Sequence, residues 1–278
     1  MSGTLYLCAT PIGNLDDMTF RAVKILRGVD LIAAEDTRHT RKLLTHFDIH
    51  TPLIRYDEFS KVQQGEKILN ELLAGKNIAC VSDAGLPAIS DPGADLVKLA
   101  INSGVKIYPI PGANAALSAL ICSGLSTEKF SFIGFLPNSK KNRREVLEKF
   151  SDREETLIFY EAPHRLKKTL SELKEFFGDR NIVLARELTK IHEEFLRGKI
   201  SELEKNLSEP KGEFVIVVEG NKSDGEKKPV EENFLDAYKN LIAAGIDKKS
   251  AIRQTANNFN LNRREVYKAV VEFEEKNF

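Results

Sequence analysis

Residues 81–93, VSDAGLPAISDPG, join a continuous apolar run, NIAC, to a helix-like run, ADLVKLAINSG. The joining stretch holds two glycines, two prolines and two aspartates, and also the apolar Leu86, Ala88 and Ile89. A plain surface turn needs neither this length nor these apolar side chains. The stretch therefore predicts a loop that contacts a ligand between a buried strand and a helix.

The same alternation of apolar and amphipathic runs extends from residue 4 to about residue 125. We expect strands at 4–10, 30–36, 77–83 and 105–112, and helices at 15–29, 38–47, 62–76, 94–104 and 113–124. Strands that alternate with helices favour a mostly parallel sheet with helices on both faces. A first α/β domain is thus predicted over 1–125.

A second α/β domain is predicted over 126–220. Its expected strands are 130–137, 155–163, 181–189, 193–198 and 213–220, and its expected helices are 142–151, 164–177 and 199–207. Some of these strands follow one another through short connections, which favours a mixed sheet. Residues 221–233 lack apolar periodicity and are predicted to be a linker. Residues 234–278 resemble three short helices, with a helix-turn-helix-like pattern.

The composition limits the functions that the chain can have. Its 278 residues include 41 basic and 41 acidic side chains, so overall charge does not favour general nucleic-acid binding. No apolar run reaches the roughly 18 residues of a membrane span. The N-terminus lacks the basic flank and apolar core of a signal peptide. We therefore expect a cytoplasmic protein.

The cysteines and histidines give no sign of a metal site. Cys8, Cys80 and Cys122 lie in apolar settings, which predicts buried free thiols in a reducing compartment. The five histidines show no ligand spacing with them, so no metal is predicted.

Three loops are expected at the carboxyl ends of the strands of the first sheet, where open α/β sheets bind ligands. They are residues 9–17 (ATPIGNLDD), 81–93 and 109–120 (PIPGANAALSAL). Neither a GxGxxG nor a GxxxxGK[ST] pattern is present, which weakens a nicotinamide or ATP site. Each loop alone could be a structural turn, whereas three together favour a binding site.

Seven segments carry a resemblance to a known family. They are LYLCATPIGNLDDMTFRAVKIL, AAEDTRHTRKLL, VSDAGLPAISDPG, PGANAALSALICSG, FIGFLP, IFYEAPHRL and ARELTKIHEE. In this order they resemble the ribosomal RNA small-subunit methyltransferase I family of the tetrapyrrole methylase superfamily. The resemblance implies two α/β domains with a cofactor cleft between them, and S-adenosylmethionine as the cofactor. It also implies a homodimer that methylates the ribose 2′-hydroxyl of a cytidine in 16S rRNA of the 30S subunit.

The resemblance also implies which residues contact the cofactor. They are Ile12, Ala84, Gly85, Leu86, Ile89, Asn114, Ala115, Glu161, Leu188 and Glu213. The glycine-rich loops point to the first seven independently. Leu188 is nominated by the resemblance alone, and core packing remains an equal alternative for it.

A ribose hydroxyl is a weak nucleophile, so a general base is useful. The candidates are Glu35, Asp36 and Glu161, from the segments AAEDTRHTR and YEAPHR. Asp36 could instead cap a helix that begins at Thr37.

Locally basic segments predict RNA contacts. The predicted RNA-binding residues are Arg38, Arg41, Lys140, Lys141, Arg143, Arg144, Arg165, Lys248, Lys249, Arg253, Arg263 and Arg264. The helix-turn-helix-like pattern predicts a small core made of Ala251, Ile252, Ala256, Phe259, Leu261, Val266, Tyr267 and Val270. The C-terminal helices could instead be a solvated cap with no ligand. Two rival functions remain: a methylase of a tetrapyrrole or a protein side chain, and a non-enzymatic RNA-binding assembly factor.

Overall fold

The computed structural model describes residues 2–207, 209–221, 233–259 and 261–277. It divides into two compact units, Met1–Asn221 and Lys222–Phe278. Within the predicted linker 221–233, residues 222–232 lie outside the described residues. None of the helices in the described ranges is long and apolar enough to cross a membrane.

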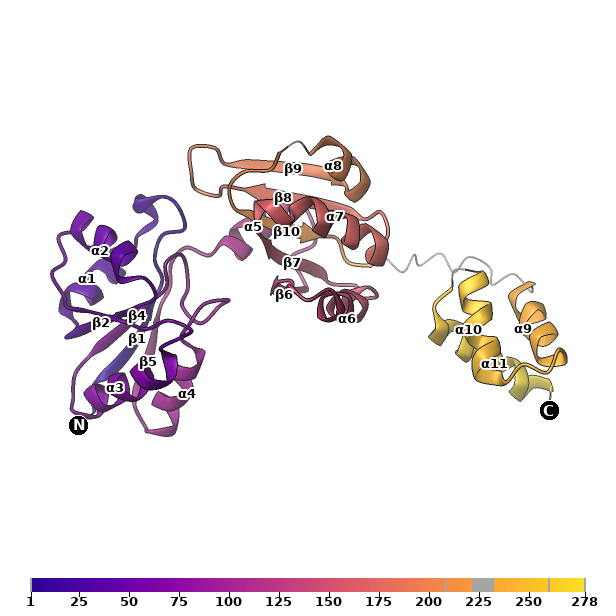
Figure 1. The fold of residues 1–278 in the computed structure, drawn as a ribbon, viewed down its shortest axis with the longest axis horizontal. Coiled ribbons are helices and arrows are strands. Elements are labelled where there is room, and N and C mark those ends of the chain that lie inside the picture. Colours follow the sequence, from indigo (N-terminus) through magenta and orange to yellow (C-terminus); the bar gives the residue numbers. More distant parts are fainter. Residues whose placement is uncertain (1, 208, 222–232, 260, 278) are drawn as a thin grey trace. The chain divides into compact units, whose positions relative to one another are not determined.

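The first sheet is wholly parallel, as predicted (Figure 1). Its strands are β1 (Thr4–Cys8), β2 (Leu31–Ala34), β3 (Leu53–Arg55), β4 (Ile78–Val81) and β5 (Lys106–Ile110), in the order β3-β2-β4-β1-β5. The sequence analysis missed β3, because a strand of three residues is too short to show a periodic pattern.

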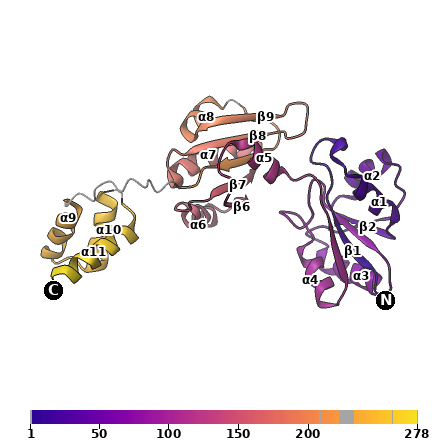
Figure 2. The same cartoon turned by 180° about the vertical axis from the view of Figure 1, so that it is seen from behind.

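Helices cover both faces of this sheet, as expected (Figures 1 and 2). Helices α1 (Phe20–Gly28) and α2 (Thr37–His46) pack on one face, and a short 3₁₀ turn, η1 (Leu15–Asp17), precedes α1. Helices α3 (Lys61–Leu73) and α4 (Ala94–Asn102) pack on the other face. Cys8 and Cys80 point to opposite faces, and burial raises the pKa of each thiol to about 12. Both are buried free thiols, as predicted.

The helix α5 (Ala115–Ser123) belongs to the second sheet rather than the first. Its buried Ala116, Ala119 and Leu120 pack in one cluster with Ile158 and Val217 of that sheet. Small alanine side chains allow the helix to lie close to the strands. The opposite side of α5 faces outward, so the prediction of a buried Cys122 is wrong: this thiol is exposed.

The second sheet is mixed, as predicted. Its strands are β6 (Phe130–Phe135), β7 (Thr156–Glu161), β8 (Asn181–Arg186), β9 (Glu194–Lys199) and β10 (Phe214–Val218), in the order β6-β7-β10-β8-β9. Only β6 and β7 pair in parallel. Central strand β10 is apolar on both sides: Val215 and Val217 pack with α5, whereas Phe214, Ile216 and Val218 lie in the opposite core.

Helices α6 (Lys140–Phe150), α7 (Pro163–Phe177) and α8 (Ile200–Asn206) contribute to that opposite core. Arg143 on α6 forms an ion pair with Glu172 on α7, with Nε 2.7 Å from Oε2 and side-chain exposures of 4% and 13%. The RNA contact predicted for Arg143 is therefore corrected, because its charge is directed into the helix packing. By itself, the sequence pattern of α6 does not distinguish a basic surface residue from a buried one.

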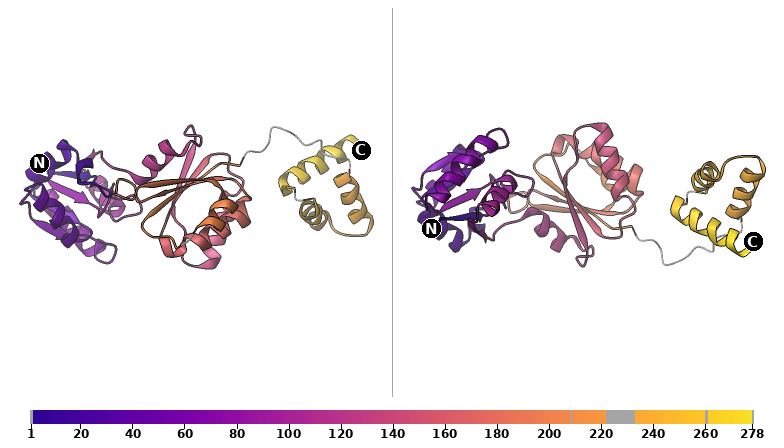
Figure 3. Two further views of the ribbon diagram at one scale, coloured as in Figure 1. Left: turned by 90° about the horizontal axis from the view of Figure 1, so that it is seen from above. Right: turned by 90° about the horizontal axis from the view of Figure 1, so that it is seen from below.

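The described residues of the C-terminal unit form three helices, α9 (Asn233–Ala243), α10 (Lys248–Asn258) and α11 (Arg263–Asn277) (Figure 3). Its core contains Phe234, Tyr238, Ala251, Ile252, Ala256, Val266 and Val270. The expectation that Phe259, Leu261 and Tyr267 join this core is wrong, since all three are exposed. Helix α9 supplies the aromatic side chains that fill the space instead.

Replacing Arg143 with Met should lower the free energy of unfolding by about 3–5 kcal/mol, because Glu172 would remain buried without its partner. The Arg143→Met/Glu172→Met double variant should recover most of this loss, since apolar side chains of similar size often replace a buried pair at little cost. Urea denaturation of both variants measures the difference.

Arg144→Met is the matched control, because the neighbouring Arg144 pairs with Glu175 at the surface. It should cost about 1 kcal/mol or less. Equal losses for Arg143→Met and Arg144→Met would contradict a structural role for the buried pair.

Candidate functional site

The loops that follow β1 and β4 are joined by a two-residue antiparallel bridge. The backbone N–H of Thr10 donates to the carbonyl of Gly85 at 2.9 Å, and the N–H of Gly85 donates to the carbonyl of Thr10 at 3.1 Å. The Thr10 hydroxyl also donates to the carbonyl of Ser82 at 3.1 Å. Strand β1 lies between β4 and β5, so the bridge occurs where ligands bind in open α/β sheets.

The loop after β4 contains unusual backbone conformations. Ala88 and Ser90 adopt φ angles of 70° and 62°, in the left-handed region that non-glycine residues seldom occupy. Such residues cost of order 1–3 kcal/mol each and concentrate at functional sites. The N–H of Ala88 donates to the carbonyl of Pro92 at 3.2 Å, which closes the loop on itself. This shape presents Ile89 and Asp91 to a cavity.

The segment that follows β8 contributes a second strained turn. Glu187 and Thr189, on either side of Leu188, have φ angles of 49° and 68°. The Glu187 carboxylate accepts the N–H of Glu213 at 2.8 Å and the ammonium of Lys190 at 3.0 Å. The N–H of Glu213 holds the pKa of Glu187 below its ordinary value, and Lys190 adds to this effect. These contacts fix the turn with Leu188 directed at the same cavity.

The cavity has a volume of about 440 Å³, within the usual range for small-molecule sites. All ten residues predicted to contact a cofactor line it: Ile12, Ala84, Gly85, Leu86, Ile89, Asn114, Ala115, Glu161, Leu188 and Glu213. Leu188 is largely buried and packs with α5. It therefore belongs to the core and lines the cavity as well. The cavity is lined by both sheets of the first unit.

Several residues of the cavity wall were not predicted from the sequence. Asp83 and Asp91 lie within the loop 81–93, and their acidic side chains were the available signal. Phe135 and Tyr160 also line the cavity. Nothing in their sequence context distinguished them from ordinary core residues of strands.

One part of the wall is acidic. Glu35 follows β2, and burial raises the pKa of its carboxyl group, with the charge of Asp83 adding to the effect. Burial also raises the pKa of Asp91 to about 6, and the charge of Glu35 contributes. The carboxyl groups of Glu35 and Asp91 thus lie in an acidic surrounding that includes Asp83.

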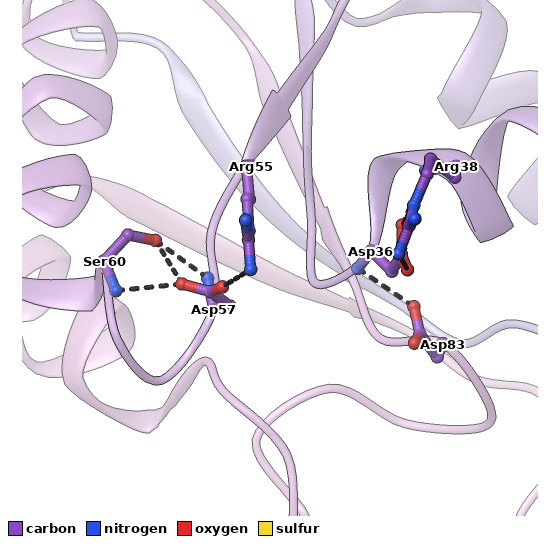
Figure 4. A network of polar contacts seen from close by, with 6 residues as sticks. All are labelled: Asp36, Arg38, Arg55, Asp57, Ser60 and Asp83. Carbon is purple, nitrogen blue, oxygen red and sulfur yellow. Dashed lines mark hydrogen bonds and ion pairs between the residues drawn. The ribbon is translucent and has the colours of Figure 1, made fainter.

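Asp36 caps helix α2, as the alternative for this residue predicted. Its carboxylate accepts the N–H of Arg38 at 2.8 Å and two bonds from the Arg38 guanidinium, at 3.2 and 2.9 Å. These bonds hold the pKa of Asp36 well below its ordinary value. Figure 4 shows this pair, and the backbone N–H of Asp36 donating to Asp83 at 3.0 Å. Asp36 does not line the cavity, so its predicted catalytic role is not carried further.

A neighbouring carboxylate, Asp57, is also engaged. It accepts the N–H and the hydroxyl of Ser60, at 2.9 and 2.5 Å, and forms an ion pair with Arg55 (Figure 4). Hydrogen bonds from Ser60 hold the pKa of Asp57 below its ordinary value. Asp57 therefore adds a fixed negative charge near Glu35.

Glu161 is buried, and its carboxylate accepts two hydrogen bonds and forms one ion pair. Thr169 donates to it at 2.6 Å, the N–H of Ala162 donates at 2.9 Å, and Arg165 forms an ion pair at 3.2 Å. The Arg165 guanidinium also donates to the side chain of Asn138 and the carbonyl of Leu136. Arg165 thus connects β7 to the segment after β6, and the RNA contact predicted for it is corrected.

The remaining predicted RNA-binding residues lie at the surface or in a second hollow. Arg41, Lys140 and Lys141 are exposed, and Arg38 and Arg144 are surface residues paired with acids. In the C-terminal unit a hollow is lined by Lys248, Lys249, Ser250, Ile252, Arg253, Arg263 and Tyr267. The side chain of Arg264 lies outside the described residues.

Comparison with a family model agrees with the fold. The model of Tetrapyrrole (Corrin/Porphyrin) Methylases matches residues 4–204. Among solved structures, the chain is similar to uroporphyrin III C-methyl transferase from Thermus thermophilus, with a TM-score of 0.58 and 16% identity. That match covers 78% of this chain and 97% of the other. At this identity the likeness shows the fold alone.

Much closer relatives exist among curated proteins. The chain is 52% identical, over 273 residues, to ribosomal RNA small subunit methyltransferase I of Halalkalibacterium halodurans, covering 95% of this chain and 93% of that protein. It is 51% identical to the protein of the same name from Bacillus subtilis, covering 96% of this chain and 94% of that one. The chain therefore belongs to the ribosomal RNA small subunit methyltransferase I family, within the Tetrapyrrole (Corrin/Porphyrin) Methylases.

Proposed function

We propose that this protein is an S-adenosylmethionine-dependent methyltransferase that modifies the ribose 2′-hydroxyl of a cytidine in 16S rRNA. The observation that carries the proposal is the identity of about half of all residues, over nearly the full chain, to proteins named for ribosomal RNA methylation. The cavity at the strand ends adds an independent physical argument, because a methyltransferase needs a site for a small-molecule methyl donor.

The wall of the cavity fits S-adenosylmethionine in both shape and charge. Ile12, Leu86 and Leu188 provide apolar surface for a flat ring, and Gly85 allows its backbone to approach a ligand. The carboxyl groups of Glu35 and Asp83 complement a positively charged ligand. When bound, S-adenosylmethionine supplies a methyl group on a cationic sulfur, which is the electrophile of the reaction.

The residues of the chain then have to position the groups and exclude water. The bridged loops of Thr10 and Gly85 form a rigid floor, and the strained turn around Leu188 forms an apolar side wall. Glu161, held by the N–H of Ala162, the hydroxyl of Thr169 and the charge of Arg165, fixes the start of α7. Alignment of this kind is a large part of catalysis in a two-substrate transfer.

The second hollow suits a phosphate backbone. Lys248, Lys249, Arg253 and Arg263 contribute positive charge to it, and the exposed Tyr267 adds a polar aromatic surface. We propose that this hollow binds rRNA of the 30S subunit chiefly through phosphate groups. The exposed Arg41, Lys140 and Lys141 are proposed to contribute further RNA contacts.

The resemblance to the family also supports a homodimer in the cytoplasm, where 30S subunits are modified. Leu117 and Ile121 on α5 are 46% and 74% exposed, beside the exposed Cys122. Apolar side chains gathered on one helix face are typical of surfaces that another chain covers. Light scattering at micromolar concentration distinguishes one copy of the 31.2 kDa chain from two.

The function is tested by incubating the protein with methyl-labelled S-adenosylmethionine and 30S subunits that lack the modification. Label should appear on 16S rRNA, at the 2′-oxygen of a single cytidine, because an intact ribose 2′-methyl group resists alkaline hydrolysis at that position. A tetrapyrrole precursor should receive no label. RNA binding without label transfer would support the assembly-factor alternative instead.

Gly85→Val should weaken S-adenosylmethionine binding at least tenfold in calorimetry. Gly85 has a φ of 80°, and a Cβ there would lie 3.3 Å from Cγ2 of Ile12 and 3.5 Å from the carbonyl oxygen of Ala113, at the cavity wall. Gly104→Val is the matched control: Gly104 also has a positive φ, of 70°, but a Cβ there meets nothing within 4 Å. Unchanged affinity in Gly85→Val, or equal losses in both variants, would contradict the placement of the cofactor.

Replacing Lys248, Lys249, Arg253 and Arg263 together with Gln should weaken 30S binding and flatten its dependence on salt. Each lost phosphate contact lowers the slope of log affinity against log salt by roughly 0.7–0.9, so the total change should approach about 3. Affinity for S-adenosylmethionine should not change. A control with the same loss of charge replaces four exposed lysines of the first domain, Lys24, Lys67, Lys98 and Lys106. If both quadruple variants bind alike, the hollow has no specific part in RNA binding.

A further inference from the structure

Asp91 occupies a rigid position on the wall of the proposed cofactor cavity. It follows Ser90, whose left-handed backbone turns the chain toward the cavity. Ser90 in turn packs closely on β6, since a Cβ built on Gly134 would lie 3.1 Å from its hydroxyl oxygen. The loop therefore contacts both sheets of the first unit, and Asp91 has little freedom to move.

Most other carboxylates near the cavity already have hydrogen-bond or ion-pair partners. Glu161 has three partners, and Asp36 caps α2 outside the cavity. Glu213 forms an ion pair with Lys190 at 2.9 Å. Asp83 accepts the backbone N–H of Asp36. These contacts hold the four carboxylates in structural roles.

The groups that face Asp91 come from three segments: the one after β2, the one after β4, and strand β7. Ser82, after β4, lowers the pKa of Asp91 through its hydroxyl group, and the carboxyl groups of Glu35 and Asp83 lie near enough to raise it. From the second sheet, Tyr160 also interacts with the charge of Asp91. Asp91 thus lies at the place where both walls of the cavity meet.

We propose that Asp91 is the general base of the methyl transfer, accepting the proton of the ribose 2′-hydroxyl, with Glu35 and Ser82 as positioning residues. This inference rests on the proposed function. The new bond joins the ribose 2′-oxygen to the methyl carbon, and the carbon–sulfur bond breaks with its electron pair remaining on sulfur. The hydroxyl proton passes to the Asp91 carboxylate and then to solvent.

The electrostatic surroundings suit this role. Burial and the charge of Glu35 raise the pKa of Asp91 to about 6, which makes it a stronger base than an ordinary aspartate while leaving it mostly ionised at pH 7. A general base with a pKa near the working pH is the most effective, and it typically contributes 10²–10⁴-fold to the rate.

The test is single-turnover methylation of 30S subunits between pH 5 and pH 8. In the wild type the rate should fall about tenfold per pH unit below about pH 6, because only the ionised Asp91 accepts a proton. Asp91→Asn should lower the rate 10²–10⁴-fold and remove this dependence. Its affinity for S-adenosylmethionine, measured by calorimetry, should stay within about threefold of wild type, since the amide keeps the shape of the carboxyl group.

Asp95→Asn is the matched control, because Asp95 lies on α4, four residues further on, and pairs with Lys61 outside the cavity. It should retain the wild-type rate and pH profile. A rate in Asp91→Asn within tenfold of wild type would overturn the inference, as would a loss confined to cofactor affinity. Absence of methyl transfer by the wild type would instead overturn the proposed function itself.

Two further variants test the assignment without removing Asp91. Glu35→Gln removes a negative charge that raises the pKa of Asp91, so the midpoint of the acid limb should move to lower pH. Ser82→Ala removes a hydroxyl group that lowers this pKa, so the midpoint should move to higher pH. Midpoints that stay in place in both variants, or a Glu35→Gln enzyme that loses the acid limb altogether, would exclude Asp91 as the base.

Discussion

The reciprocal backbone bonds between Thr10 and Gly85 are the constraint on which the rest of the site depends. A parallel sheet brings the carboxyl ends of neighbouring strands to one edge, but the loops that leave them are free to diverge. The bridge joins two of these loops, and it requires a residue that tolerates the left-handed conformation at position 85. Once this connection exists, the loop after β4 can hold strained residues such as Ala88 and Ser90 in a single shape.

Two carboxylates that have several bonding partners complete the framework around the cavity. Glu161 fastens the start of α7 to β7, and Glu187 fastens the turn around Leu188 to the strand β10 segment. Each accepts backbone and side-chain donors together, so neither carries an uncompensated buried charge. Glu35 and Asp91, the two acids of the cavity wall whose pKa is raised, lie on the opposite wall, in loops of the first sheet.

Much of the fold could be predicted from the sequence, because it depends on periodic patterns. The alternation of apolar and amphipathic runs was enough for the parallel sheet, and the short connections after residue 181 indicated the mixed one. Patterns of this kind do not indicate which sheet a helix covers. The packing of α5 on the second sheet was therefore not predicted. A three-residue strand such as β3 carries too little pattern to be detected.

The site was predictable where glycines and family motifs marked the loops. It was less predictable where the role of a residue depends on its tertiary contacts. The sequence showed the basic character of Arg143 and Arg165, whereas only the structure reveals the acids that engage them. Asp91 was visible in the sequence, but its importance depends on burial and on Glu35, which is 56 residues away along the chain.

The unequal burial of the cysteines has a practical consequence. Cys8 and Cys80 are shielded in the cores on either side of the first sheet, whereas Cys122 is exposed. A thiol-reactive dye added to the native protein would therefore attach selectively at one position, without any engineering of the chain. That position lies on α5, whose first residue, Ala115, lines the cavity. The protein thus carries a built-in attachment point for a fluorescent reporter within two helical turns of its ligand site.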